Sequence, residues 1–242
     1  MKASDNSIIS PSPEEKQFIL EPNLLLDRIT GLLWDHIVHG RIRPGTRLVE
    51  RQLADELGIS RVPVREALIQ LEKEGLIVSR PNGRYVIELS EEDINKLYVV
   101  RGVLERLAVE LATQNTSPEY ADARENKLQE MREAVAQQDL GAFSRNDFEI
   151  HRLIWRQANN PYLLDVLRTL TGPIYMFIAD NAAHFDWGGI LELHTNLIHC
   201  INSGDVRAAL EAIDVHMDDG LHRSSQVFRN GKQRMSGQNN KE

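Results

Sequence analysis

The sequence predicts a mostly α-helical protein with an N-terminal winged helix-turn-helix domain followed by an all-α helical bundle. Two observations carry this prediction. Within residues 22–88, three stretches with a helical repeat of apolar residues precede one β-hairpin signal. Over residues 89–228, apolar residues recur at intervals of three and four, without a convincing strand. The polar ends, 1–21 and 229–242, are expected to be a flexible arm and a flexible tail.

Two helices open the first domain. Apolar residues at intervals of three and four predict a helix over 23–40, which Gly40 ends. A second, short helix is expected over 50–57, and Gly58 after it permits a tight turn.

A third helix follows at once. Ser60 is its expected N-cap, with an oxygen that accepts from amides of the first turn, and Glu74-Gly75 ends it. Two β-rich runs, 76–78 and 85–87, then flank an Asn-Gly pair that signals a hairpin.

This order resembles a helix-turn-helix followed by a wing. Arg61 and Arg65 occupy the exposed face of the second helix of the pair, where arginine reaches guanine edges or phosphates. Arg80, Asn82 and Arg84 lie at the hairpin tip, as a second candidate contact. The alternative is a small helical domain with a solvated arginine face.

The net charge of −8 argues against a nucleic-acid partner when it is taken for the whole chain. The local balance reverses that inference. Residues 23–88 carry a net +1, and residues 89–227 carry a net −10. The acidity therefore belongs to the bundle rather than to the candidate DNA-binding domain.

The single cysteine, Cys200, excludes an intramolecular disulfide and favours a reducing compartment. The N-terminus lacks the features of a secretory signal, and the apolar runs are too short to cross a bilayer. We therefore expect a cytoplasmic protein without a membrane partner.

Six helices are expected in the bundle, and clear breaks separate several of them. Asn159-Asn160-Pro161 and Ser203-Gly204-Asp205 mark two joints. The expected helices begin at Ser90 and then near 118–137, 139–158, 161–182, 188–202 and 205–228.

One aspartate and three histidines of the bundle have a spacing that suits a metal. Asp147 and His151 are four apart, so they project from one helix face. His194 and His216 flank the turn at Gly204 at similar distances, which places them at similar heights on neighbouring helices. Such a set suits zinc, nickel, cobalt or manganese and leaves positions for a carboxylate or water. The alternative is four ordinary polar side chains.

Three stretches resemble the winged-helix domain of the GntR family of bacterial transcription regulators: GRIRPGTRL at 40–48, ERQLA at 50–54 and GISRVPVREAL at 58–68. The resemblance implies contacts with double-stranded operator DNA. It departs from the family pattern at Val49, where many members have a capping Ser or Thr, and in the order of residues at the wing tip. It implies that Arg51, Arg61 and Arg65 contact the DNA and that Gly83 lies in the wing. The full set of expected DNA-binding residues is Arg51, Ser60, Arg61, Val62, Arg65, Asn82, Gly83 and Arg84.

Residues 94–228 resemble the FCD effector domain of the FadR-type subfamily of GntR regulators. The resemblance places Asp147, His151, His194 and His216 at the metal-binding positions, inside the bundle, where the metal helps to bind a small organic acid. Arg101 is then either the charge partner of an effector carboxylate or one half of a salt bridge with Glu105.

The leading hypothesis is a ligand-responsive transcription regulator. A homodimer would place two winged helices on a palindromic operator, and an organic acid at the metal site would change DNA binding. A metal sensor is one alternative. A metal-dependent enzyme with a regulatory DNA-binding domain is another, but the sequence lacks a convincing general base, nucleophile motif or phosphate loop, so we expect no enzyme activity.

Overall fold

The structure, a computed structural model, describes residues 7–9, 11–13, 15, 25–115 and 117–238, with side chains described up to residue 230. The chain divides into two compact units, Met1–Glu88 and Leu89–Glu242. Each unit has its own core. The predicted fold class, a winged helix-turn-helix followed by a helical bundle, is confirmed.

Among the described residues, the first unit combines α-helices with a small antiparallel sheet. Its elements are α2 (Leu25–Val38), β1 (Arg47–Leu48), α3 (Glu50–Leu57), α4 (Arg61–Lys73), β2 (Ile77–Arg80) and β3 (Gly83–Val86). Apolar side chains of α2 and α4 are fully buried, among them Leu33, Ile37 and Leu68. Gly58, with φ 72°, adopts the left-handed conformation between α3 and α4 that the sequence pattern requires.

The sheet is antiparallel in the order β1-β3-β2, so β3 lies in the middle. The short strand β1 was not expected, because two residues give no periodic signal. In the hairpin, Arg80 pairs with Gly83, so the turn residues are Pro81 and Asn82 rather than the expected Asn-Gly pair. Gly83 opens β3 with φ 139°, a conformation that L side chains rarely adopt.

The described part of the expected flexible arm, 1–21, packs partly against the rest of the first unit. Ile9 is buried, and the amides of Ile8 and Ile9 donate to the carboxylate of Glu56 at 3.0 and 2.8 Å. The expectation that little of the arm is buried is wrong at this point, because two adjacent apolar residues, Ile8 and Ile9, give no periodic pattern. Residues 1–6, 10, 14 and 16–21 of that arm lie outside the described residues.

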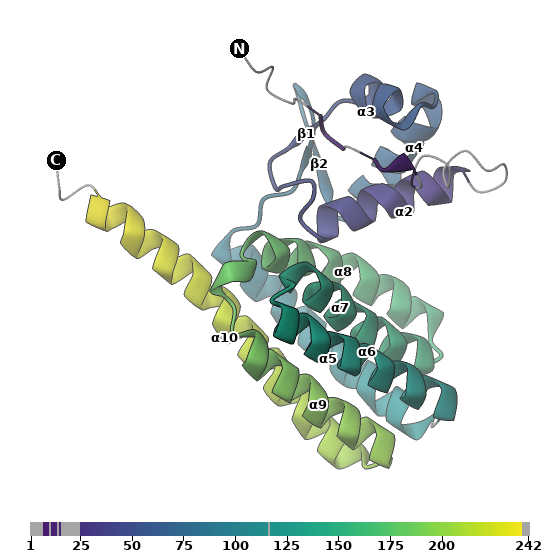
Figure 1. The fold of residues 1–242 in the computed structure, drawn as a ribbon, viewed down its shortest axis with the longest axis vertical. Helices are drawn as coiled ribbons and strands as arrows, with labels where there is room; N and C mark the ends of the chain where they lie inside the picture. The colour runs from purple at the N-terminus through teal and green to yellow at the C-terminus, as the bar shows by residue number, and fades with distance from the viewer. Residues whose placement is uncertain (1–6, 10, 14, 16–24, 116, 239–242) are drawn as a thin grey trace. The chain divides into compact units, whose positions relative to one another are not determined.

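The second unit is a helical bundle whose helices run side by side (Figure 1). Its elements are α5 (Glu91–Gln114), α6 (Pro118–Gln137), α7 (Leu140–Gln157), α8 (Pro161–Asp180), the 3₁₀ turn η1 (Ala182–His184), α9 (Trp187–Ser203) and α10 (Val206–Gln238). Side-chain caps define several starts. Ser90 and Asp93 form a capping box on α5, and Asp139 and Asn160 accept amides of α7 and α8.

Helix α10 extends further than expected. The sequence indicated a flexible tail over 229–242, but the helix continues to Gln238. No proline interrupts the stretch, and adding residues to a nucleated helix is far easier than starting one. Residues 239–242 lie outside the described part of the chain.

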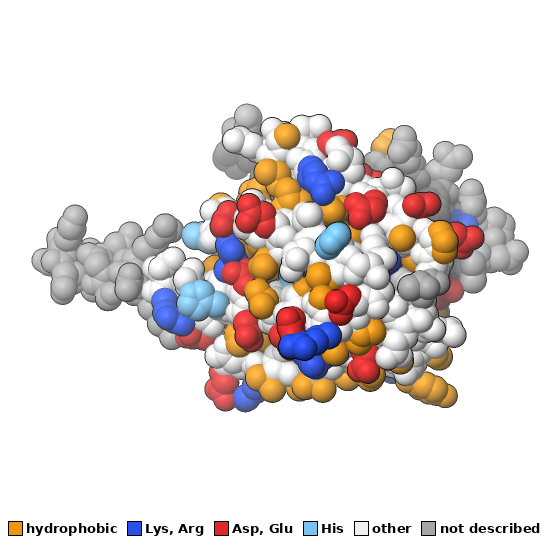
Figure 2. Space-filling model, turned by 90° about the horizontal axis from the view of Figure 1, so that it is seen from below, with side chains coloured by type: hydrophobic (Ala, Val, Ile, Leu, Met, Phe, Trp, Pro, Cys, Tyr) orange, Lys and Arg blue, Asp and Glu red, His pale blue; other side chains and the backbone are white. Residues whose placement is uncertain are grey.

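The surface of the bundle reflects its charge. Figure 2 shows acidic side chains spread among apolar ones, with basic side chains fewer and mostly single on the face seen there. This agrees with the net charge of −10 over residues 89–227. Over the described residues, none of the helices is both long enough and apolar enough to span a membrane.

Candidate functional sites

Helix α4, the expected recognition helix, exposes its predicted contact residues to solvent. Arg61, Val62 and Arg65 are all exposed at its N-terminal end, and Val62 is 61% exposed although it is apolar. Ser60 occupies the N-cap position, but its side chain makes no capping hydrogen bond. The expected cap interaction is therefore wrong, and the first-turn amides of α4 lack this side-chain acceptor. Free amides at a helix N-terminus favour anions.

The other predicted contacts flank this helix. Arg51 of α3 has a side chain that is 82% exposed and pairs only loosely with Asp55, at 3.8 Å. Asn82 lies exposed in the hairpin turn, and Arg84 follows in β3. A Cβ added at Gly83 would lie 3.0 Å from Nε of Arg47, so glycine allows the Arg47 side chain to lie close against the wing backbone.

Glu50, which the sequence analysis did not single out, connects these arginines. Its carboxylate accepts from Arg65 Nε at 3.1 Å and from Arg84 Nη1 at 2.8 Å, and Arg61 Nη2 lies 3.8 Å away. Hydrogen bonds from Arg65, opposed by partial burial and reinforced by Arg84, hold the pKa of Glu50 below its usual value. Glu50 is therefore ionised at neutral pH. A glutamate at the first turn of a helix is so common that its position alone gave no signal.

In the bundle, the structure brings Asp147, His151, His194 and His216 together. The ligand atoms of the three histidines lie within 4.8 Å of one another. Nε2 of His151 and of His216 are 3.2 Å apart, and Asp147 Oδ1 lies 3.1 Å from His194 Nε2 and 3.7 Å from His151 Nε2. The four residues come from α7, α9 and α10, and each is at most 9% exposed.

Second partners orient two of these imidazoles. His151 Nδ1 lies 3.3 Å from Glu105 Oε2, and His194 Nδ1 lies 2.9 Å from the Ile190 carbonyl oxygen. Each oxygen can accept a hydrogen bond from a protonated Nδ1, and this tautomer leaves the lone pair of Nε2 directed at the cluster. This is the arrangement that metal-bound histidines adopt, so the residues present fit a transition metal.

The electrostatics of the cluster are those of a site that holds a cation. Burial alone raises the pKa of Asp147, but the neighbouring His194 and His151 outweigh it and hold that pKa well below its usual range. Burial and the two neighbouring imidazoles lower the pKa of His216 well below its usual value, so this ring stays neutral. Burial lowers the pKa of His194, but the Asp147 carboxylate outweighs it and raises that pKa, so this ring must release any proton before it binds a metal. An ionised carboxylate beside imidazole nitrogens is a donor set that suits a divalent transition metal.

Arg101 lies beside this cluster and has unused hydrogen-bonding capacity. It is 2% exposed, its Nε donates to Glu105 Oε1 at 3.0 Å, and its Nη2 has no hydrogen-bond partner among the described residues. Burial raises the pKa of Glu105, but His151 and Arg101 reverse this and lower it to about 2. The salt bridge and the free Nη2 coexist, so the two interpretations of Arg101 are compatible.

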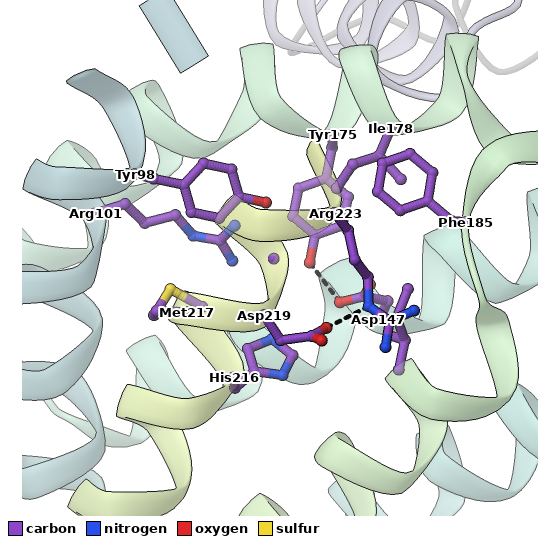
Figure 3. A pocket seen from close by; sticks show the side chains of 12 residues that line it. Tyr98, Arg101, Asp147, Tyr175, Ile178, Phe185, His216, Met217, Asp219 and Arg223 are labelled. Carbon is purple, nitrogen blue, oxygen red and sulfur yellow. Dashed lines mark hydrogen bonds and ion pairs between the residues drawn. The ribbon is translucent and has the colours of Figure 1, made fainter. Parts of the chain in front are cut away.

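A small cavity joins Arg101 to the cluster. Figure 3 shows Arg101, Tyr98 and His216 around it, with Tyr175 donating to Asp147 Oδ1 at 2.5 Å and Arg223 paired with Asp219. The cavity volume is about 30 Å³. Space of this size holds about two water molecules, so a larger ligand requires lining side chains to move. The lining residues are Tyr98, Arg101, Asp147, Tyr175, Ile178, Phe185, Ile190, His216, Met217, Asp219, Gly220 and Arg223.

Sequence reasoning did not find Tyr175, Asp219 or Arg223. Tyr175 lies within the apolar run of α8, where an aromatic residue is indistinguishable from core. Asp219 and Arg223 form an i,i+4 pair on α10, a pattern that normally marks a solvated helix face. Only their positions, one and two turns after His216 on α10, place them near the cluster.

Two family profiles match the chain. The family described as bacterial regulatory proteins, gntR family, matches residues 25–87, and the FCD domain matches residues 96–219. Together they cover both units.

Among curated relatives, the gluconate operon transcriptional repressor of Bacillus licheniformis is 31% identical over 79% of this chain and 82% of its own length. A protein named uncharacterized HTH-type transcriptional regulator YdhC, from Bacillus subtilis, is 28% identical over 81% of this chain and 89% of its own. Among solved structures, Escherichia coli McbR/YncC covers 84% of this chain and 98% of its own, with a TM-score of 0.77 and 21% identity. At 21% sequence identity, the similarity to this structure shows the fold alone.

Proposed function

This chain belongs to the GntR family of bacterial regulatory proteins and carries an FCD domain, and from this premise we propose that it binds operator DNA under the control of a small organic acid. The chain is a transcription regulator and not an enzyme, since the matching families and relatives are transcription regulators. The first unit reads DNA, and the bundle binds a metal and the acid.

The observation that carries the proposal is the position of Arg101 beside the metal-ligand cluster. Asp147, His151, His194 and His216 would hold one divalent transition metal, with zinc first and nickel, cobalt or manganese as alternatives. When bound, the metal supplies a Lewis-acidic position for a carboxylate oxygen. The free Nη2 of Arg101 offers a donor to the same ligand from a buried guanidinium.

An acid is the ligand class that this pocket favours. Arg101 has the only guanidinium in the cavity that is nine-tenths buried among the described residues, and burial strengthens its attraction for an anion. Apolar residues, Ile178, Phe185 and Met217, line the remaining wall and suit a short carbon chain. One relative is named as a repressor of a gluconate operon, and gluconate is a carboxylate.

An exposed apolar stripe supports a homodimer. Val99, Val103 and Leu107 lie along one face of α5 and are 66%, 69% and 41% exposed, and Val215 of the adjacent α10 is 57% exposed. Arg106 and Asp214 form an ion pair between the same two helices. Contiguous apolar surface of this kind marks an interface, and a second copy of the chain would cover it.

DNA binding is tested by mobility shift on the intergenic DNA upstream of the gene. Arg65→Ala removes an exposed guanidinium from the N-terminal end of α4, and we expect it to weaken binding at moderate salt by about 10-fold or more. Binding equal to that of the parent would show that α4 is not the recognition helix.

A metal sensor is the second candidate function, because the cluster is complete without the acid. The mobility-shift assay, run with zinc alone and with zinc plus small carboxylates, distinguishes a metal sensor from an acid-responsive regulator. If zinc alone changes DNA binding and small carboxylates add nothing, the ion itself is the signal.

A further inference from the structure

One acidic side chain lies at the centre of the face that is proposed to meet DNA. Glu50, on the first turn of α3, is within 3.8 Å of guanidinium groups from two elements of this face: Arg61 and Arg65 of α4, and Arg84 of the wing. Its side chain is 19% exposed, whereas those of Arg61 and Arg65 are 59% and 52% exposed. The carboxylate therefore lies beneath the arginines that project from this face.

The geometry of the Arg65 contact leaves part of the guanidinium available. Nε and Nη2 of Arg65 lie 3.1 and 3.0 Å from Glu50 Oε2, so one edge of the planar group is engaged. A guanidinium has a second edge, Nη1 and Nη2, with two parallel N–H groups. That edge is the one that binds O6 and N7 of guanine in the bidentate contact of the major groove.

The Arg84 contact connects the wing to the same point. Arg84 Nη1 donates to Glu50 Oε1 at 2.8 Å, and its Nε lies 3.5 Å from Glu72 of α4. The Arg84 side chain is only 23% exposed, which is much less than those of the α4 arginines. One charge-assisted hydrogen bond to α3 and one longer ion pair to α4 thus hold the base of the wing relative to these two helices.

A negative charge at this place opposes the general attraction for phosphate. DNA backbone affinity grows with the positive charge offered, without regard to sequence. Sequence discrimination instead requires donors that are held in fixed positions, because a flexible arginine satisfies a phosphate as readily as a base. A central carboxylate therefore weakens the non-specific affinity for phosphate and strengthens the discrimination between sequences.

We propose that Glu50 is a positioning residue for operator recognition: its carboxylate orients Arg65 toward a base edge and fixes Arg84 of the wing, and so raises discrimination between operator and non-specific DNA. The proposal rests on the proposed DNA-binding function of the first unit. It assigns to Glu50 no direct contact with DNA.

The proposal predicts opposite changes in two measured affinities. In Glu50→Gln the amide keeps the size of the side chain but releases the arginines and removes one negative charge. Operator affinity falls by about 10-fold, while affinity for a scrambled duplex of equal length rises by about 3-fold, so the specificity ratio falls by about 30-fold. The salt dependence on the scrambled duplex becomes steeper, by about one ion, because a released arginine contacts phosphate.

The experiment uses the full-length protein and a duplex selected from a random library with the parent. Fluorescence anisotropy at several salt concentrations gives both affinities for each variant. Glu66→Gln is the matched control, because it removes the same charge from an exposed position of α4 outside this cluster. We expect that variant to raise affinity for both duplexes alike and to leave the ratio unchanged.

Glu50→Asp separates position from charge. It keeps the negative charge but shortens the side chain by one methylene, so it lowers the specificity ratio by a smaller factor without raising non-specific affinity. If Glu50→Gln melts at a lower temperature than the parent, the specificity ratio of Glu50→Asp is used to test the proposal.

The outcomes distinguish this proposal from the function on which it rests. If Arg65→Ala keeps the operator affinity of the parent, α4 is not the recognition helix. That result would overturn both the proposed DNA-binding face and the role of Glu50. Loss of operator binding in Arg65→Ala together with an unchanged specificity ratio in Glu50→Gln and Glu50→Asp would overturn the role of Glu50 alone. An equal rise in both affinities in Glu50→Gln would identify Glu50 as a simple counter-charge and would also overturn it.

Discussion

Nε2 of His151 and Nε2 of His216 lie 3.2 Å apart in the interior of the bundle, although the two residues are 65 positions apart in the sequence. Both rings are buried. Two imidazole nitrogens at this distance either share one proton or direct both lone pairs at a cation. The presence of Asp147 beside them favours the cation.

Metal content is predicted to depend on His194. Purified parent protein should contain about one transition-metal ion per chain, and His194→Ala should lose most of it, because removal of one of four ligands greatly weakens binding. Elemental analysis measures the content. His199→Ala is the matched control, since His199 is exposed on the same helix. Full occupancy in His194→Ala would remove this residue from the ligand set.

The oligomeric state is predicted to depend on the apolar stripe of α5. The parent should behave as a dimer of 27.6 kDa chains in size-exclusion chromatography with light scattering, and Val103→Glu should shift it toward monomer. Val103 is 69% exposed, so the substitution should leave the fold of the chain intact. Tyr162→Glu changes an even more exposed residue, on α8, and should remain dimeric. A dimer that survives Val103→Glu would place the interface elsewhere.

The effect of Glu50 is predicted to be insensitive to mild acid. Arg65 and Arg84 hold the pKa of Glu50 below its usual value of 4.5. A carboxyl whose folded pKa is lowered stays ionised, and keeps its ion pairs, until the pH falls below the unfolded value. The ratio of operator affinities between the parent and Glu50→Gln should therefore be constant from pH 8 to pH 5. A ratio that approaches one already at pH 6 would contradict the assigned ionisation.

Local sequence patterns predicted much of this fold, because interactions between residues close in the sequence determine where many of its helices begin and end. Ser90 with Asp93, Asn160 before Pro161, and Gly204 each mark a helix end through a hydrogen bond or a left-handed conformation that involves only near neighbours. The metal-ligand set was also accessible, since Asp147 and His151 share one helix face. The spacing of His194 and His216 about a tight turn then placed them at similar heights.

What the sequence did not reveal depends on contacts between distant segments. Glu50 meets Arg84 across 34 positions, and the amide of Ile9 meets Glu56 across 47, and no periodic pattern records either pair. Tyr175 reaches Asp147 from a neighbouring helix, whose apolar run hides its role. Side-chain positioning of this kind follows from packing, and packing is read only from the structure.

The central claim is that an acid bound by Arg101 and the metal site changes operator affinity. The most direct measurement is operator affinity of the zinc-loaded protein with and without the small carboxylate that most raises its thermal midpoint, in the parent and in Arg101→Lys. Lysine keeps a positive charge near Glu105 but lacks the free Nη2 donor. We predict a change of about 5- to 150-fold in the parent and little change in Arg101→Lys. Equal responses of the two proteins, or no response of the parent to any carboxylate, would contradict the account.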